Sequence, residues 1–310
     1  MQIIEKIKKL KEEKNAVILA HYYVADEVQA VADYVGDSFY LSKVAVNLTA
    51  QVIVFCGVSF MGESAKLLNP DKMVLMPDMK ADCAMAHMAD PAYIAEMKRE
   101  YEDLQVVCYI NSTAELKALS DVCVTSANAV DIVKELPGKN ILFIPDENLG
   151  RHVAKQVPEK HFIFNPGCCP VHAQMKADEV KKLKELHPQA PVLTHPECRE
   201  DILALSDYIG STSGIIGYAA ASEKEEFIIC TESGVAYELG KRAPGRTFYF
   251  PETLPVCMDM KLITLEKIAD VLEDENGQVH VDAGISEAAC RPLRAMLELA
   301  EQARRKKEGK

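Results

Sequence analysis

Apolar runs of four to six residues alternate with helical patterns along most of the chain. The segments 52–77, 141–166 and 227–251 each contain such a run, then a loop containing glycine, a helical stretch and a second short run that ends in proline. Buried strands that alternate with helices indicate parallel sheets with crossover helices. The amphipathic residues 1–14 and the segment from 283 predict further helices at the two ends.

The same polar landmarks recur three times at nearly constant spacing. Three triplets, which begin 88 and then 86 residues apart, follow apolar runs: His21-Tyr22-Tyr23, Tyr109-Ile110-Asn111 and His195-Pro196-Glu197. Seventeen residues after the start of each triplet is a hydroxyl residue: Ser38, Ser126 and Thr212. Five residues before each hydroxyl is an aspartate: Asp33, Asp121 and Asp207. Vague recurrence occurs in any α/β protein, but constant offsets indicate internal triplication.

The repeat predicts an α/β fold of three homologous αβα units with small parallel sheets, arranged about a pseudo-threefold axis. We expect the units at residues 15–104, 105–190 and 191–282, preceded by a helix at 1–14 and followed by a C-terminal helix and tail at 283–310. Ligands of open parallel sheets gather outside the carboxyl ends of the strands, where the triplets lie.

Charge and hydropathy exclude some functions. The formal net charge of −12 argues against non-specific nucleic-acid binding and gives no support for binding to anionic lipids. No apolar run approaches the ~18 residues of a membrane span, and no signal peptide is evident. We therefore expect a cytoplasmic protein whose ten cysteines stay reduced, which raises the question of metal binding or catalysis.

Three cysteines keep the period of the repeat: Cys83, Cys169 and Cys257, which lie 86 and 88 residues apart in loops after the proline-terminated strands. Equivalent loops around one axis would bring these thiolates together, and thiolates suit zinc or an iron–sulfur cluster. A cubane cluster normally takes four cysteines, so three would leave one iron open as a Lewis acid. Zinc is not excluded, because His87 and His172 lie near two of these cysteines.

The other cysteines have simpler interpretations. Those in or beside apolar runs are expected in the core: Cys56, Cys108, Cys123 and Cys230. Cys198 is expected to begin a helix and Cys290 to lie in the C-terminal helix, and neither keeps the period. Cys168 is out of phase by one residue, so it is not included among the metal ligands.

The triplets predict a polar site around the same axis: His21, Tyr23, Tyr109, Asn111, His195 and Glu197. The three hydroxyls are expected beside helix N-termini, which suit carboxylate or phosphate groups. Glu197 is the best candidate for a general base, since it is the only carboxylate among the triplets and His195 lies close to it. No glycine-rich fingerprint follows the first strands, so a nucleotide cofactor is not indicated.

Taken together, these segments resemble the quinolinate synthase family of de novo NAD biosynthesis. The resemblance covers essentially the whole chain and rests on motifs in a specific order: AHYY (20–23), GDS (36–38), YINS (109–112), TSAN (125–128), GCCPVH (167–172), HPE (195–197), GSTSG (210–214) and CMDMKLITL (257–265). It implies three αβα domains and one [4Fe-4S] cluster held by Cys83, Cys169 and Cys257. Some family members carry a CxxCxxC motif at the third ligand, where this chain has Pro251, Leu254 and Cys257.

The resemblance also implies an activity. A transferase of this family condenses iminoaspartate with dihydroxyacetone phosphate to give quinolinate, phosphate and water, with the non-cysteine iron binding substrate. Carried over by position, the substrate-binding residues would be His21, Ser38, Tyr109, Ile110, Asn111, Ser126, His195, Pro196, Glu197 and Thr212. The catalytic residues would be Tyr23, Tyr109, His195 and Glu197. An L-aspartate oxidase or dehydrogenase would supply the imine.

Three other functions remain open at this point. The nearest is a different three-unit, three-cysteine iron–sulfur enzyme, which product analysis would distinguish. A zinc-dependent hydrolase would differ in metal content and colour. A non-catalytic redox sensor would use a cluster without needing the periodic His, Tyr and Glu residues.

Overall fold

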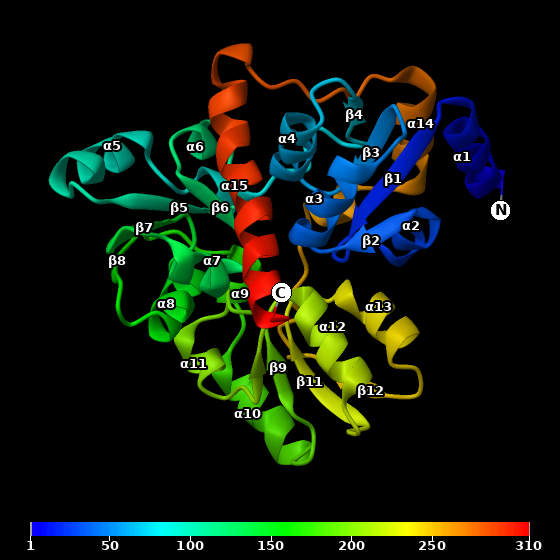
Figure 1. Ribbon diagram of the computed structural model, residues 1–310. Coiled ribbons are helices and arrows are strands. Elements are labelled where there is room, and N and C mark those ends of the chain that lie inside the picture. The colour runs from blue at the N-terminus through cyan, green and yellow to red at the C-terminus, as the bar shows by residue number, and fades with distance from the viewer. Residues whose placement is uncertain (1, 310) are drawn as a thin grey trace.

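The computed structural model describes residues 2–309 and contains three parallel sheets of four strands each (Figure 1). The first sheet comprises β1 (Ala16–His21), β2 (Tyr34–Gly36), β3 (Val52–Cys56) and β4 (Met73–Leu75). The second comprises β5 (Gln105–Tyr109), β6 (Val122–Val124), β7 (Asn140–Ile144) and β8 (His161–Phe164). The third comprises β9 (Val192–Thr194), β10 (Tyr208–Ile209), β11 (Glu226–Cys230) and β12 (Thr247–Tyr249).

All three sheets have the same strand order, in which the first strand lies between the second and the third and the fourth lies outside the third. The prediction of three α/β units with small parallel sheets is therefore confirmed. The strand pairing also corrects the alignment of two repeat segments, 52–77 and 141–166, which were matched from their first residues. Val17 and Gln105 are equivalent, since they lie 88 residues apart, and they pair with Ile53 and Ile141. Ile141 is therefore equivalent to Ile53 and not to Val52.

Helices connect the strands and cover both faces of each sheet. The first sheet carries α2 (Asp26–Val31), α3 (Ser38–Asn47) and α4 (Ser59–Leu68). The second carries α6 (Ala114–Ala118), α7 (Ala129–Glu135), α8 (Glu147–Gln156) and α9 (Pro170–Ala173), and α5 (Pro91–Glu100) also lies beside it (Figure 1). The third carries α10 (Ala177–Leu186), which contacts β11, together with α11 (Glu200–Leu203), α12 (Thr212–Ala221) and α13 (Val235–Arg242). The central strands are buried on both faces, which explains their unbroken apolar sequences.

The recurring aspartates have one structural role in all three units. The carboxylate accepts the backbone N–H near the start of the first strand: Asp33 from Ile18 at 2.8 Å, Asp121 from Val106 at 2.7 Å and Asp207 from Val192 at 2.9 Å. The backbone N–H of each aspartate donates to the carbonyl of the same strand residue. This pair of bonds holds the second strand beside the first.

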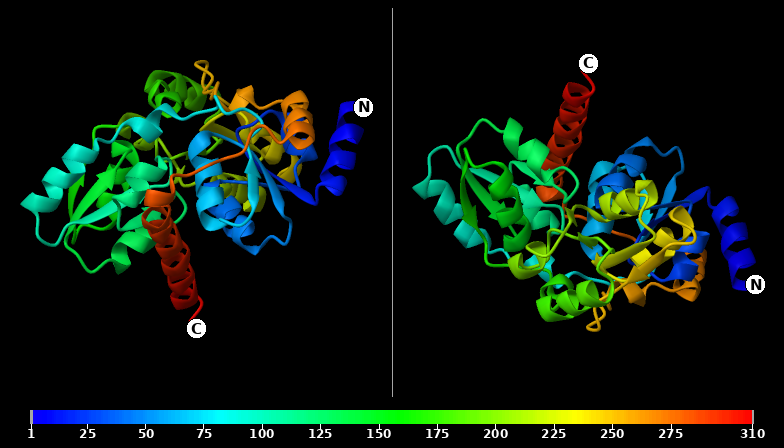
Figure 2. Two further views of the ribbon diagram at one scale, coloured as in Figure 1. Left: turned by 90° about the horizontal axis from the view of Figure 1, so that it is seen from above. Right: turned by 90° about the horizontal axis from the view of Figure 1, so that it is seen from below.

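Segments that follow the third sheet pack against the first two. The helix α14 (Leu265–Asp274) lies against α1 (Gln2–Glu13), and the backbone of residues 277–279 bonds to Met76 and Val74 at the edge of β4. The long helix α15 (Ala283–Lys307) packs on α4, α6 and α7. Both views in Figure 2 place the start of α15 between the blue first sheet and the cyan-green second sheet.

The cysteines predicted to lie in the core are buried, namely Cys56, Cys108, Cys123 and Cys230. Cys290 lies in α15, as expected, and is also buried. Cys198 is buried too, but the prediction that it begins a helix is wrong, because α11 begins at Glu200 after an N-cap at Arg199. Within residues 2–309, no helix combines the length and apolar composition that a membrane crossing requires.

Replacing one of the recurring aspartates should weaken the fold slightly. In Asp121→Ala the N–H of Val106 loses its acceptor at a partly exposed position, so we expect the free energy of unfolding to fall by about 0.5–1.5 kcal/mol. Denaturant unfolding measures this change. Asp178→Ala, whose side chain is 94% exposed, serves as the control, and an equal loss in both variants would contradict the role assigned to Asp121.

Candidate functional site

One cavity lies at the carboxyl ends of the strands and collects residues from all three units. It has about 700 Å³ of empty space, which includes its open mouth. Nine of the predicted polar residues line it: His21, Tyr23, Ser38, Tyr109, Asn111, Ser126, His195, Glu197 and Thr212. Cys83, Cys169 and Cys257 line the same cavity. Ile110 and Pro196, from the middle of two triplets, are not among its lining residues.

The local structure explains why these side chains point into the cavity. His21 and Tyr109 are the last residues of β1 and β5, and His195 follows β9 directly. Two of the hydroxyl residues, Ser38 and Thr212, are the first residues of α3 and α12. Ser126 differs from the prediction, since α7 begins three residues later, at Ala129.

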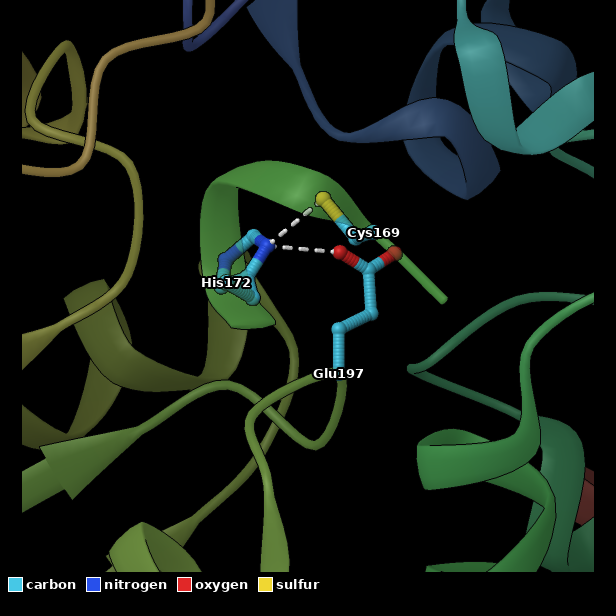
Figure 3. A group of neighbouring side chains, drawn as sticks. All are labelled: Cys169, His172 and Glu197. Atoms are coloured by element: carbon cyan, nitrogen blue, oxygen red, sulfur yellow. Dashed lines mark hydrogen bonds and ion pairs between the residues drawn. The ribbon is translucent and has the colours of Figure 1, made fainter. Parts of the chain in front are cut away.

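The carboxylate of Glu197 lies at the centre of the polar groups and its side chain is 4% exposed. Tyr109 Oη donates to Glu197 Oε1 at 2.6 Å, and His172 Nδ1 lies 2.8 Å from Glu197 Oε2. Figure 3 shows His172 directed toward both Glu197 and Cys169. Burial alone would raise the pKa of Glu197, but His172, His195 and Tyr109 hold it below its usual range. Glu197 is therefore an ionised carboxylate that can accept a proton.

Two histidines and two tyrosines of the cavity are held neutral. Burial lowers the pKa of both His21 and His195 to about 3, and His195 Nε2 lies 3.1 Å from Ser126 Oγ. Burial and the charge of Glu197 raise the pKa of Tyr23 and Tyr109 well above the usual value. These phenols and imidazoles can donate or accept hydrogen bonds without carrying charge.

The Tyr23 hydroxyl is placed by residues of the third unit. Its oxygen lies 2.7 Å from Thr212 Oγ1 and 2.9 Å from Thr231 Oγ1. Thr231 Oγ1 also lies 3.1 Å from His172 Nε2. This hydrogen-bonded chain links Tyr23 to His172 and, through it, to Glu197.

The three periodic cysteines fit a metal centre. All are free thiols, and burial raises the pKa of Cys83 to about 12 and the pKa values of Cys169 and Cys257 above normal. A negative charge on Cys257 further raises the pKa of Cys83, and a negative charge on Cys83 further raises the pKa of Cys169. Thiolates at these positions would therefore repel one another. A cationic centre bound between them would remove this repulsion.

A smaller group in the cavity has the donors of a single metal site. Cys169 Sγ, His172 Nδ1 and one carboxylate oxygen of Glu197 all lie within 4.8 Å of one another. His87, the other histidine considered from the sequence, pairs instead with Asp82 at 2.8 Å, and it does not line the cavity. The structure thus contains a candidate Cys/His/Glu metal-binding group.

Several lining residues were not identified from the sequence. Glu232 is fully buried and His172 was considered only as a zinc ligand. Glu232 lies two residues after the end of β11, and Asp146 lies two residues after the end of β7. Comparing the second and third repeats would therefore have identified a carboxylate at this position. Apolar side chains complete the wall: Phe39, Val58, Phe60, Met61, Met85, Val171 and Met260.

The fold and the cavity define an α/β protein with an enzyme-type site, in which an ionised carboxylate, neutral acid–base groups and convergent thiols share one pocket. Comparison with known proteins identifies the class further. Residues 5–298 match a sequence model described as "Quinolinate synthetase A protein". The chain therefore belongs to the quinolinate synthase family, whose members are enzymes of NAD biosynthesis.

Individual relatives agree over nearly their full lengths. The chain is 53% identical over 296 residues to a quinolinate synthase of Fusobacterium nucleatum, covering 96% of this chain and 99% of the relative. It is 50% identical over 295 residues to a quinolinate synthase of Clostridioides difficile, covering 95% and 97%. It is 51% identical over 293 residues to a quinolinate synthase of Caldicellulosiruptor bescii, covering 94% and 97%.

The neutral histidines predict a pH dependence of stability. Because the folded-state pKa of His21, about 3, is below the unfolded value of about 6.5, only the unfolded state takes up this proton as the pH falls below about 6.5. Stability is thus complete above that pH and is lost below it. Between about pH 7.5 and 5.5 each such histidine should contribute a loss of about 1.4 kcal/mol.

Denaturant unfolding of reduced, metal-free protein at these two pH values measures the loss. In His21→Gln the difference between the two pH values should shrink by about 1.4 kcal/mol, and in the double variant with His195→Gln by about twice that amount. A difference that stays the same in both variants would show that these imidazoles are not held neutral.

Proposed function

We propose that this chain forms quinolinate from iminoaspartate and dihydroxyacetone phosphate, releasing phosphate and water, at a [4Fe-4S] cluster bound by Cys83, Cys169 and Cys257. The observation that carries the proposal is that the three periodic cysteines line the same cavity as the buried, ionised Glu197. Membership of the quinolinate synthase family supports the same reaction.

The donor set favours a cluster with one open position. Cubane clusters usually take four cysteines, but among the described residues the cavity is lined by three cysteines, Cys83, Cys169 and Cys257. When bound, such a cluster would supply a Lewis acid that can polarise a leaving oxygen. The groups around it would come from the protein, and they are the phenols, imidazoles and carboxylate described above.

We infer further that the units at 15–104, 105–190 and 191–282 surround a pseudo-threefold axis, with residues 283–310 as a separate C-terminal segment. Contacts between units support this arrangement, because they join equivalent positions in cyclic order. Gln29 of the first unit donates to the Gly234 carbonyl of the third at 3.1 Å. The second unit's Lys117, which is equivalent to Gln29, lies over the ring of Phe60 of the first.

The third contact of the cycle joins the remaining pair of units. Asn148 Nδ2 of the second unit donates to the Glu197 carbonyl of the third at 3.1 Å. Phe60, Asn148 and Gly234 are equivalent, since each lies four residues after the end of the third strand in its sheet. The residue at this equivalent position therefore meets a neighbouring unit at each junction.

Substrate binding would use neutral donors and helix starts. None of the residues that line the cavity is lysine or arginine, although the proposed substrates carry carboxylates and a phosphate. Ser38 and Thr212 present hydroxyls at the starts of two ten-residue helices, where backbone N–H groups attract anions. Asn111 Oδ1 is buried and has no protein partner, so it is available to accept a hydrogen bond from a substrate.

Glu197 and the two tyrosines would perform the proton transfers. The Glu197 carboxylate would accept a proton during isomerisation and imine formation, because it is ionised and its hydrogen bond from Tyr109 holds it in place. The Tyr23 and Tyr109 phenols, whose pKa values are raised, would stay protonated and donate hydrogen bonds to developing negative charge.

Product analysis tests the proposed reaction directly. Anaerobically purified protein, given freshly generated iminoaspartate and dihydroxyacetone phosphate, should form quinolinate that mass spectrometry detects, and should contain about four iron and four sulfide per chain. Cys83→Ser, Cys169→Ser and Cys257→Ser should each lose the cluster and the product. Cys168→Ser, at a cysteine that does not line the cavity, should keep both.

The same measurements separate the alternatives. A colourless protein that holds a single zinc ion at Cys169, His172 and Glu197 would contradict the cluster and favour a hydrolase. A brown protein with the cluster but no quinolinate would contradict the reaction and favour another iron–sulfur enzyme or a sensor.

Variants of the acid–base groups test the proton-transfer roles. Glu197→Gln and Tyr23→Phe should lower kcat by about 10²–10⁴-fold while the iron content is unchanged, because neither residue is a proposed ligand. Tyr22→Phe is the matched control, since Tyr22 is buried next to Tyr23 but does not line the cavity. A normal rate for Glu197→Gln would exclude Glu197 as the base.

We also propose that an L-aspartate oxidase or dehydrogenase supplies the imine. The sequence has no glycine-rich dinucleotide fingerprint after its first strands, and making iminoaspartate by oxidation needs a redox cofactor, so we assign that oxidation to a separate enzyme. Adding such an enzyme with L-aspartate should replace added imine in the product assay, and failure of this coupled assay would contradict the assignment.

A further inference from the structure

Each proposed cluster cysteine has a carboxylate on its own backbone N–H. Asp82 Oδ1 accepts the N–H of Cys83 at 2.8 Å. The two remaining bonds are longer: Asp146 Oδ2 accepts from Cys169 at 3.2 Å and Glu232 Oε1 accepts from Cys257 at 3.0 Å. The same contact thus occurs in all three units, although the residues around it differ.

Two of these carboxylates are completely buried, which is costly unless their oxygens are bonded. Asp146 Oδ1 accepts a second N–H, from Leu149 at 2.7 Å. Glu232 Oε2 accepts from Gly234 at 2.7 Å, and its Oε1 also lies 3.1 Å from the ammonium of Lys261. The two buried carboxylates therefore connect the cysteine loops to the helices that follow the third strand of each unit. Asp146 connects the Cys169 loop to the first turn of α8, and Glu232 connects the Cys257 loop to the residue before α13.

The bond to the cysteine N–H recurs in all three units, but the carboxylate does not come from the same position in each. Asp146 and Glu232 are equivalent, and the corresponding residue of the first unit is the apolar Val58. There the carboxylate comes instead from Asp82, beside Cys83 in the sequence, and the hydroxyl of Ser59 donates to it. A different residue makes the same bond where the equivalent position has no carboxylate.

We propose that Asp82, Asp146 and Glu232 are positioning residues that hold the three cysteine loops so that their sulfur atoms face one point in the cavity. The inference rests on the cluster proposed above. A carboxylate is needed at the buried positions, because each accepts backbone N–H groups on both oxygens. An amide has one acceptor oxygen, so in Asp146→Asn or Glu232→Gln an NH₂ group would face one of the two backbone N–H groups, and the loop would lose one of its two hydrogen bonds.

The three positions should not be equally sensitive. The Asp82 side chain is 44% exposed and bonds to His87, so water can replace its hydrogen bond to Cys83. Water cannot reach Asp146 or Glu232 in the same way, since both are fully buried. Loss of the bond should therefore affect the loops of Cys169 and Cys257 more than the loop of Cys83.

The test measures how tightly the reconstituted protein keeps its iron. Asp146→Asn and Glu232→Gln, reconstituted anaerobically, should release iron to a chelator about 10–100-fold faster than the wild type, the usual effect of losing a partner of a metal ligand. Asp82→Asn should show a smaller increase. Asp121→Asn is the matched control, because its carboxylate bonds a strand N–H in the same unit as Asp146, away from the cysteines.

Two further measurements separate positioning from general loss of structure. Thermal unfolding of the metal-free chains should differ little between Asp146→Asn and Asp121→Asn. The cluster of Glu232→Gln should have a higher reduction potential than the wild type, because a negative charge beside Cys257 is removed and Lys261 is left unbalanced.

The outcomes distinguish this inference from the proposed function. A wild type that binds no cluster would overturn the proposed function. A wild type with a cluster, together with release rates in Asp146→Asn and Glu232→Gln equal to that of Asp121→Asn, would overturn the positioning role alone. Faster release with an unchanged potential in Glu232→Gln, or with a metal-free Asp146→Asn chain that is much less stable than metal-free Asp121→Asn, would also overturn it.

Discussion

Keeping the carboxylate of Glu197 ionised and out of water sets the layout of the whole site. A buried charge of this kind is tolerated only when other groups replace its lost hydration. Glu197 belongs to the third unit, whereas the Tyr109 hydroxyl and the His172 ring that bond it belong to the second. His172 also reaches Thr231, which bonds Tyr23 of the first unit. The charge is therefore stable only when all three units are in place.

The proposed reaction uses anionic substrates in a cavity without lysine or arginine in its lining. Recognition then depends on hydroxyls, neutral imidazoles and helix starts, which bind through short contacts of defined geometry. Such a site favours molecules that fit its donors over anions in general.

Repetition made much of this protein predictable. A constant period of 86–88 residues identified the three sheets, and it also identified the cysteines and polar residues that share the cavity. Contacts between units were not predictable, because the period states which positions are equivalent and not which neighbour each side chain meets. Within a unit the period also has a limit, because the carboxylate on Cys83 comes from Asp82, whereas Asp146 and Glu232 occupy a different position in their units. The return of residues 277–279 to β4 likewise left no periodic signal.

The helices α14 and α15 have a consequence for biosynthesis. They follow the third sheet in the chain, yet α14 covers α1, and α15 packs on α4 of the first unit and on α6 and α7 of the second. Domains usually fold in order as they leave the ribosome. Here the first unit keeps an exposed apolar surface until α15 has been translated, and the hydrogen bond of Cys290 to the Leu67 carbonyl joins residues 223 positions apart. Until then the nascent chain exposes a surface of the kind that makes incomplete folds prone to aggregation.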